Sequence, residues 1–254
     1  MTFLMNSPFL VFFISFFALW LSTYMGVFLR GKREKLNEEE REDFGVILTA
    51  TLTLLGLIIG FTFSMAISRY DQRQHFEEQE ANAIDNVHNR ADLLPPADAA
   101  KVRALLVDYL RERILFYEDR NQSEIPQLDA RTEQLQADIW DTVRTAVAAQ
   151  QTPVLAMVLS SADGLLGSAG NTQAAWQNRI PIEAWALMGG IAICASLLIG
   201  YGMRTAKANS VLVIILVLIV SVSFFLIADI DSPRGGLIHI HPNNLTSLAK
   251  SLNR

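Results

Sequence analysis

The sequence is poor in the residue patterns that mark catalytic, metal and nucleic-acid sites. Its single cysteine, Cys194, lies in an apolar run, so one chain can form neither a disulfide nor a cysteine-based metal site. It has no nucleophile beside a base, no phosphate-binding glycine loop and no zinc-protease helix, so we predict no enzyme, no metal and no cofactor. A net charge of −5 without a basic, aromatic-rich patch argues against nucleic acid as a partner.

Charged residues are also nearly missing from four long stretches, although 51% of the residues are hydrophobic. These stretches are residues 8–29, 44–67, 182–203 and 210–228. Each has about 20 residues, which as a helix spans a hydrocarbon core of roughly 30 Å. A lipid-exposed span must also satisfy its own backbone hydrogen bonds, which a helix does. The sequence therefore predicts an all-α integral membrane protein with four transmembrane helices, and the lipid bilayer as its surroundings.

The first stretch differs from a cleaved signal peptide. It has no positively charged residues before it, it is too long, and basic residues follow it in place of a small-residue cleavage site. Short polar loops then join spans one and two, and spans three and four, as antiparallel hairpins. We expect a first hairpin in residues 1–67, a soluble segment in 68–181, a second hairpin in 182–228 and a tail in 229–254.

The soluble segment has helical composition and spacing throughout, with no alternating strand pattern. Span two is expected to continue beyond the membrane to Leu94, where two prolines follow. We expect Asp98 to cap the next helix, a third helix over about 128–150, and Thr152 to cap a fourth. The glycines between residues 164 and 170 predict a bend or break in that fourth helix.

Lysines and arginines near the span ends predict the orientation. They gather in the two short loops, which places these loops in the cytoplasm and the N-terminus, the soluble segment and the tail outside the inner membrane. These residues are Arg30, Lys32, Arg33, Lys35, Arg41, Arg204 and Lys207. Arginines at the opposite span ends weigh against this orientation; they are Arg69, Arg73, Arg179 and Arg234.

Three groups of residues resemble a known family. The first is Gly60-Phe61-Thr62-Phe63-Ser64-Met65-Ala66 with Arg69-Tyr70-Asp71, the second is Glu80-Ala81-Asn82-Ala83-Ile84 with Arg90-Ala91-Asp92-Leu93-Leu94-Pro95, and the third is the tail 229–238. Together they resemble the bacterial bestrophin-like family, over most of the chain. Asp85-Asn86 and Ser161-Ala162-Asp163 depart from the family pattern.

The resemblance implies a membrane protein distantly similar to the bestrophins, which are pentameric anion channels. It implies a homo-oligomer as the assembly and a small ion as the permeant species. The resemblance also implies a cytoplasmic soluble part, which conflicts with the charge count above; we retain the charge count because it is a property of this chain.

Span two carries a stripe of small and hydroxylated residues three or four positions apart. The stripe consists of Gly45, Thr49, Thr53, Gly56, Gly60, Ser64 and Ser68. It is typical of close helix packing, and a matching row in span three (Ala192, Ser196, Gly200) favours packing between these two helices. The alternative is that the stripe lines a pore, in which Phe61 and Phe63 form an apolar constriction and Arg69 and Arg73 attract anions at the mouth.

Two further groups of polar residues allow alternative interpretations. Glu77, Glu80 and Asn82 lie on the extension of span two, near the predicted ion mouth. They form a solvated face with internal ion pairs, collect a cation, or pair with Arg69 and Arg73 from another helix. Asp229 and Asp231 end span four close to hydrocarbon, with Arg234 as the nearest candidate partner. They either fix the exit of the span or take part in ion coordination or gating.

Two functions therefore compete. The first is an oligomeric bestrophin-like ion channel, for which the resemblance implies anions. The alternative is a membrane-tethered receptor or scaffold whose helical segment binds a ligand or a protein. An intramembrane enzyme has no motif to support it.

Overall fold

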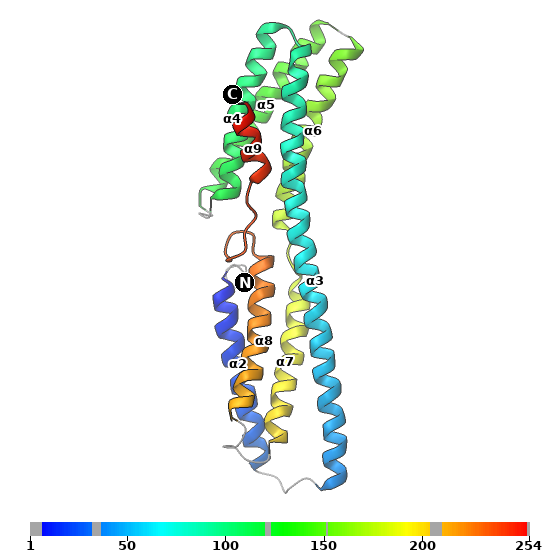
Figure 1. The fold of residues 1–254 in the computed structure, drawn as a ribbon, viewed down its shortest axis with the longest axis vertical. Coiled ribbons are helices and arrows are strands. Elements are labelled where there is room, and N and C mark those ends of the chain that lie inside the picture. The colour runs from blue at the N-terminus through cyan, green and yellow to red at the C-terminus, as the bar shows by residue number, and fades with distance from the viewer. Residues whose placement is uncertain (1–6, 32–36, 120–122, 151, 204–209, 253–254) are drawn as a thin grey trace. The chain divides into compact units, whose positions relative to one another are not determined.

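The computed structural model confirms the all-α class and the four membrane-spanning helices (Figure 1). It describes residues 7–31, 37–119, 123–150, 152–203 and 210–252. Lys32, Arg33, Lys35, Arg204 and Lys207, on which the predicted orientation partly depends, lie outside the described residues. The helices form two compact units, one of residues 1–69 and 179–239 and the other of residues 70–178 and 240–254.

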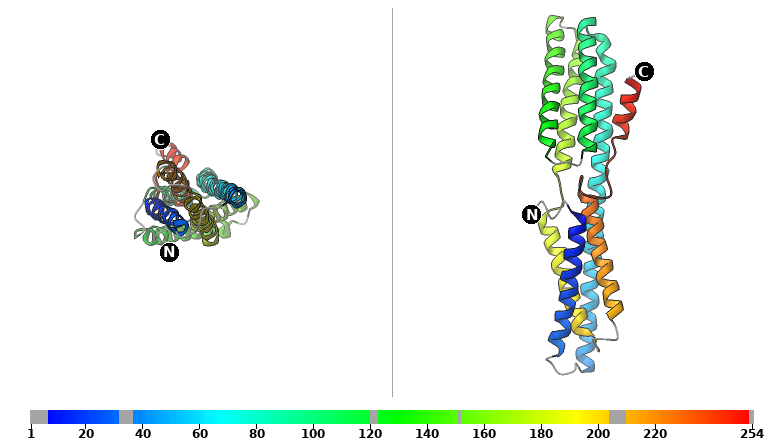
Figure 2. Two further views of the ribbon diagram at one scale, coloured as in Figure 1. Left: turned by 90° about the horizontal axis from the view of Figure 1, so that it is seen from below. Right: turned by 90° about the vertical axis from the view of Figure 1, so that its left-hand side faces the viewer.

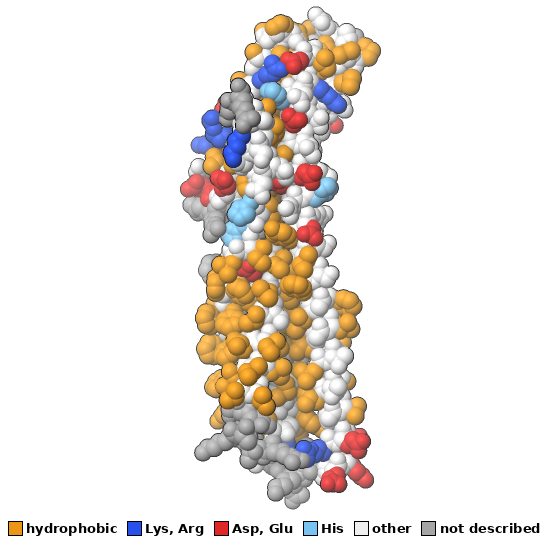
Figure 3. Space-filling view, viewed as in Figure 1, with side chains coloured by type: hydrophobic (Ala, Val, Ile, Leu, Met, Phe, Trp, Pro, Cys, Tyr) orange, Lys and Arg blue, Asp and Glu red, His pale blue; other side chains and the backbone are white. Residues whose placement is uncertain are grey.

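The first unit contains the four hydrophobic helices. They are α2 (Pro8–Gly31), the first part of α3 (Glu38–Arg90), α7 (Ile182–Gly202) and α8 (Ser210–Asp231). Asn37 caps α3 by accepting a 3.0 Å hydrogen bond from the Glu40 amide, while the Glu40 carboxylate accepts one from the Asn37 amide. Orange hydrophobic side chains cover much of this unit in Figure 3, as expected for helices that face lipid.

The spans do not pack as two independent hairpins. Helix α2 packs along both α7 and α8, whereas α7 and α8 share a much smaller contact (Figures 1 and 2). The α2–α7 contact is parallel, because Ser22 Oγ donates to the Ile193 carbonyl at 2.8 Å and Arg30 donates to the Tyr201 carbonyl at 2.8 Å. The short loops join spans that follow one another in sequence, but loop length did not predict that span one packs mainly on span three.

The row Ala192, Ser196 and Gly200 is buried, and its Gly200 packs against α2, whereas packing against span two was predicted. Gly200 and Gly26 let the two backbones meet. A Cβ atom on Gly200 would overlap the Thr23 carbonyl, and one on Gly26 would overlap the Leu197 carbonyl. Small residues at a membrane helix contact allow this close approach, and the identity of the partner helix is decided by the tertiary fold.

The second unit is a helical bundle. Its helices are the Tyr70–Arg90 part of α3, the 3-10 turn η1 (Ala91–Leu93), α4 (Pro96–Glu118), α5 (Ile125–Ala149), α6 (Pro153–Gln177) and α9 (Asn243–Leu252). Helix α4 packs on α5, α5 on α6, and α9 on α4. Residues at helical spacing form the core, including Ile84, Leu106, Ile139 and Leu165, each fully buried.

Three local predictions have mixed outcomes. Thr152 caps α6 as expected, accepting a 3.3 Å hydrogen bond from the Leu155 amide. Asp98 does not cap α4, since Pro95 occupies the N-cap and Asp98 lies in the first turn. Helix α6 runs unbroken through Gly164, Gly167 and Gly170. Each glycine costs a helix only about 1 kcal/mol, which burial of the opposite face of α6 offsets.

Candidate functional site

The stripe on α3 is exposed along its whole length within the chain. Gly45, Thr49, Thr53, Gly56, Gly60, Ser64 and Ser68 are all exposed. The buried side of the helix in this region consists of Leu55, Thr62 and Ala66, and no neighbouring atom would lie within 4 Å of a Cβ added to any of the three stripe glycines. The part of α3 seen in Figure 3 accordingly shows much pale surface between its orange side chains.

The most hydrophobic window of α3 is only 6% buried, compared with 22% for α2 and 33% for α8. Among these helices, the span in α3 is therefore the one least covered by the rest of its own chain. Phe61 and Phe63 are 63% and 36% exposed. They are two positions apart on a helix of 3.6 residues per turn, so they flank the stripe on opposite sides.

The predicted ion-mouth residues do not form one exposed group. Arg73, Glu77 and Glu80 are buried, at 1%, 1% and 0% exposure, while Arg69 is half-buried and Asn82 is exposed. Arg73 donates hydrogen bonds to the carbonyls of Ala175 (3.1 Å) and Asn178 (3.0 Å) at the end of α6. The last carbonyls of a helix receive no hydrogen bond from the helix itself. The positively charged guanidinium donates to them and also complements the negative end of the helix dipole. Arg73 thus closes a helix end.

Arg69 also lies away from the stripe. It follows Gly60 by two and a half turns, which places it on the opposite side of α3. Its Nη2 atom lies 3.8 Å from the sulfur of Met65, one turn earlier. Arg69 therefore does not face the same side of α3 as Gly60, one of the candidate pore-lining residues.

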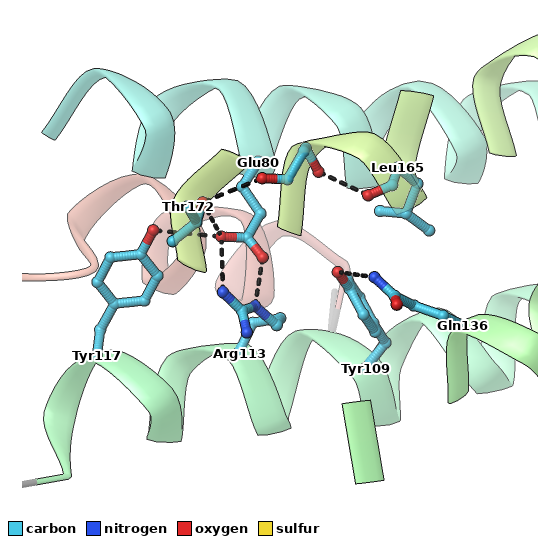
Figure 4. Close-up of polar contacts among 8 residues, drawn as sticks. Glu80, Tyr109, Arg113, Tyr117, Gln136, Leu165 and Thr172 are labelled. Carbon is cyan, nitrogen blue, oxygen red and sulfur yellow. Dashed lines mark hydrogen bonds and ion pairs between the residues drawn. The ribbon is translucent and has the colours of Figure 1, made fainter. Parts of the chain in front are cut away.

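Glu80 is the centre of a buried polar cluster (Figure 4). Its carboxylate pairs with Arg113 of α4, whose Nη2 donates to Oε2 at 3.3 Å and whose Nε donates to Oε1. The hydroxyls of Tyr117 and Thr172 each donate to Oε2 at 3.2 Å. Three helices, α3, α4 and α6, thus meet at one carboxylate that has no contact with solvent.

Burial and the Glu80 charge control the ionisation of this cluster. Burial raises the pKa of Tyr117, as does the nearby Glu80 carboxylate, so the phenol stays protonated and remains a donor. Burial lowers the pKa of the Arg113 guanidinium, but Glu80 raises it and the net shift is upward. The guanidinium also lies 4.3 Å from the centre of the Phe116 ring. The cluster is a fully paired structural junction.

Glu77 holds the start of the C-terminal helix α9. Its Oε1 accepts hydrogen bonds from the amides of Asn244 (2.9 Å) and Leu245 (3.0 Å), and its Oε2 accepts one from the Asn244 side chain (2.6 Å). A carboxylate at a helix N-terminus satisfies free amides and complements the helix dipole. Helix α9 was not predicted from the sequence, although Pro242 followed by Leu245, Leu248 and Leu252 is a helix pattern.

Asp229 and Asp231 are both buried at the end of α8, at 1% and 3% exposure. Asp229 accepts hydrogen bonds from the amides of Leu237 (2.6 Å) and Ile238 (2.9 Å), and Asp231 accepts from the Ile180 amide at 3.2 Å and 3.3 Å. Gly236 is required beside them, since a Cβ there would lie 2.6 Å from Asp229 Oδ1. The contacts with backbone amides favour the interpretation that these acids fix the exit of the span.

Arg234, the predicted partner of these two acids, is half-buried in the turn that follows α8. The described residues contain no group of three or more His, Cys, Asp or Glu side chains placed to hold a metal ion. Burial lowers the pKa of Arg179, just before α7, and the Asp231 carboxylate opposes that shift.

Comparison with known proteins identifies the family. A family model for the Bestrophin-like domain matches residues 11–245. The chain belongs to the Bestrophin-like family. No curated protein matches this Bestrophin-like chain.

Solved structures show the same fold at low sequence identity. A bacterial bestrophin homologue from Klebsiella pneumoniae is 13% identical, with a TM-score of 0.62, over 94% of this chain and 95% of that one. A point mutant of the same homologue is also 13% identical, with a TM-score of 0.63, over 93% and 96% of the two chains. A structure described only as a mutant membrane protein is 12% identical, with a TM-score of 0.64, over 94% and 97%.

Proposed function

We propose that this Bestrophin-like protein is an oligomeric ion channel in which the exposed stripe of α3 lines the pore. The observation that carries the proposal is the exposure of Thr49, Thr53, Gly56, Gly60 and Ser64 on a span that its own chain barely covers. Small and hydroxylated side chains are well suited to a hydrated surface such as a pore wall. Against lipid tails they carry a cost only where a polar atom lacks a hydrogen-bond partner. Family membership supports the same function.

In the span-three row that would have paired with this stripe, Gly200 packs against α2. Among the described residues, close packing of the stripe glycines within one chain therefore has no supporting contact. In a ring of copies, α3 would be covered by neighbouring subunits on its flanks, and the stripe would face the axis. Phe61 and Phe63, on either side of the stripe, would then contact adjacent subunits or narrow the pore.

Cysteine substitution tests this assignment. In a Cys194→Ser background, Thr53→Cys reconstituted in a planar bilayer is expected to lose most of its current when a water-soluble methanethiosulfonate reagent modifies the thiol. Thr51→Cys is the matched control, because Thr51 is two positions away, on the opposite side of α3, and makes the same type of hydrogen bond to the carbonyl four residues earlier. Equal block in both variants, or no block in Thr53→Cys, would contradict a pore at the stripe.

A polar groove in the second unit favours the alternative, a receptor. It lies between α3 and α6, has a volume of about 510 Å³, and is lined by Gln79, Asn86, Arg90, Asp163 and Asn171 among others. Arg90 donates to the Met157 carbonyl at its edge. A receptor without a pore would show no current under any gradient, which the same bilayer recordings measure.

The orientation remains a prediction from the charge count. Gln127, exposed near the start of α5, can be replaced by cysteine in the Cys194→Ser background. The charge count predicts that a membrane-impermeant maleimide labels Gln127→Cys in intact spheroplasts. Labelling only after the membrane is opened would place the second unit in the cytoplasm.

A further inference from the structure

We propose that the polar groove between α3 and α6 binds a small zwitterionic compound of the α-amino acid class. The groove lies wholly within the second unit and contains no residue of the proposed pore stripe. The inference is therefore independent of the channel function, and it assigns a ligand to a feature that a pore does not explain. Three observations carry it: the open space between the two helices, the opposite charges at one end of it, and the amide side chains along its walls.

The two helices are tied together near both ends of the groove. At one end Arg90 donates hydrogen bonds to the Met157 carbonyl at 3.2 Å and to the Ser161 hydroxyl. At the other end the Thr172 hydroxyl donates to Glu80 at 3.2 Å (Figure 4). Glu80 and Arg90 are ten positions apart, which is about 15 Å of helix. The contacts of the bundle thus fix where the groove begins and ends.

Small residues keep the middle of the groove open. Its α3 lining includes Ala83, and its α6 lining includes Gly164 and Gly167. Among the described residues, no atom lies within 4 Å of a Cβ added to either glycine. The groove has a volume of about 510 Å³, which is within the range of sites that bind small molecules.

Opposite charges lie at one end of the groove. Arg90 uses Nη1 for both of its hydrogen bonds, so Nε and Nη2 remain as donors. Asp163 is two positions after Ser161 on α6 and lines the groove near the same end. Within the described part of the chain, neither side chain takes part in an ion pair. A ligand with a carboxylate and an ammonium supplies a partner to each, whereas a simple anion or a simple cation supplies only one.

Amide side chains line the rest of the groove. They belong to Gln79, Asn86 and Asn171, and apart from Arg90 and Asp163 no charged residue lines the groove in the described structure. A carboxamide both donates and accepts hydrogen bonds. These walls therefore suit an amino acid with a neutral polar side chain, such as L-glutamine, better than one with an apolar side chain, which would leave the amides without partners.

Isothermal titration calorimetry of the purified, full-length protein in detergent tests the inference. L-glutamine is the probe, and N-acetyl-L-glutamine and L-glutamine methyl ester are matched analogues, because each lacks one of the two charges. L-glutamine is expected to bind at least about tenfold more tightly than either analogue, since each loses a charge-assisted contact. No binding of L-glutamine at millimolar concentration, or equal affinity for all three compounds, would overturn the inference. Neither result bears on the channel function, which is measured by current.

A charge variant tests the role of Asp163. Asp163→Asn is expected to weaken binding of L-glutamine by about tenfold and to leave the affinity for N-acetyl-L-glutamine unchanged, because only the first ligand carries an ammonium. Asp141→Asn is the matched control, since Asp141 is an exposed acid on α5 that does not line the groove. Equal weakening in both variants, or an equal loss for both ligands in Asp163→Asn, would contradict the assignment of the ammonium to Asp163.

A filling variant tests the position of the site. Gly167→Leu places a side chain in the open space and is expected to abolish binding of L-glutamine. Gly170→Leu is the control, because Gly170 lies on the same helix with no described atom within 4 Å of an added Cβ but does not line the groove. Unchanged binding in Gly167→Leu would overturn the inference. A change of particle mass by light scattering in Gly167→Leu alone would also overturn it, because a second copy of the chain would then cover the groove.

Discussion

Arg113→Ala is expected to reduce the stability of the second unit by about 3–5 kcal/mol, because it leaves the Glu80 carboxylate buried without its counter-ion. Glu80 is fully buried, and Arg113 is 2% exposed, so water cannot replace the lost partner. Tyr117 and Thr172 would still donate to the carboxylate, but two neutral hydroxyls do not compensate a buried charge. The expected readout is a large fall in the temperature at which the purified protein in detergent loses resistance to proteolysis in α4–α6.

Two variants distinguish charge from packing at this cluster. Glu80→Gln keeps the shape of the side chain but leaves the Arg113 guanidinium buried without its counter-ion, so a loss similar to that of Arg113→Ala is expected where charge and not packing stabilises the cluster. Arg103→Ala, which removes an exposed ion pair with Asp92, should change stability by less than about 1 kcal/mol. A similar stability for Arg113→Ala and the wild type would show that the cluster is not a structural junction.

Gly200→Ala is expected to weaken or prevent assembly of the first unit. The added methyl group would overlap the Thr23 carbonyl of α2, which is backbone and cannot move aside as a side chain can. Overpacking of this kind typically costs about 1–3 kcal/mol, and more where helices must separate. The hydrogen bond from Ser22 to the Ile193 carbonyl, about two turns before Gly200 on α7, would lengthen as the helices separate. A reduced yield of monodisperse protein and a lower melting temperature in detergent are expected.

Gly190→Ala is the control for Gly200→Ala, since it lies on the same helix with nothing within 4 Å of the added methyl group. It should behave as the wild type or slightly better, because alanine favours a helix over glycine. An equal loss of stability in both variants would mean that alanine destabilises α7 for a reason other than the contact between α7 and α2.

The helices were predictable because the local signals for them are strong. Four nearly uncharged runs of about 20 residues leave a helix as the way to satisfy the backbone in lipid. Pro95 and Pro96 ended the long helix within a few residues of the observed end of α3 at Arg90. The predicted break in α6 failed, since packing of Ala162, Leu165 and Ala169 overrides the weak local effect of the glycines.

The residues that form the buried clusters were only partly predictable. Glu77 and Glu80 were singled out as polar positions, but no local pattern shows which helix supplies the partner of a carboxylate. Arg113 carried a usable signal, because it interrupts the apolar face formed by Leu106, Tyr109 and Leu110. A cation on a core-facing stripe requires a buried partner.

By itself, the sequence determined the membrane class, the number of spans, the helical soluble segment and the family resemblance, because each depends on composition and spacing along one chain. Only the tertiary structure decided that Arg73, Glu77 and Glu80 are buried, that span three packs on span one, and that the stripe of α3 is exposed. The physical reason is that helix periodicity shows which residues share a face, whereas the partner of that face depends on contacts between segments far apart in sequence.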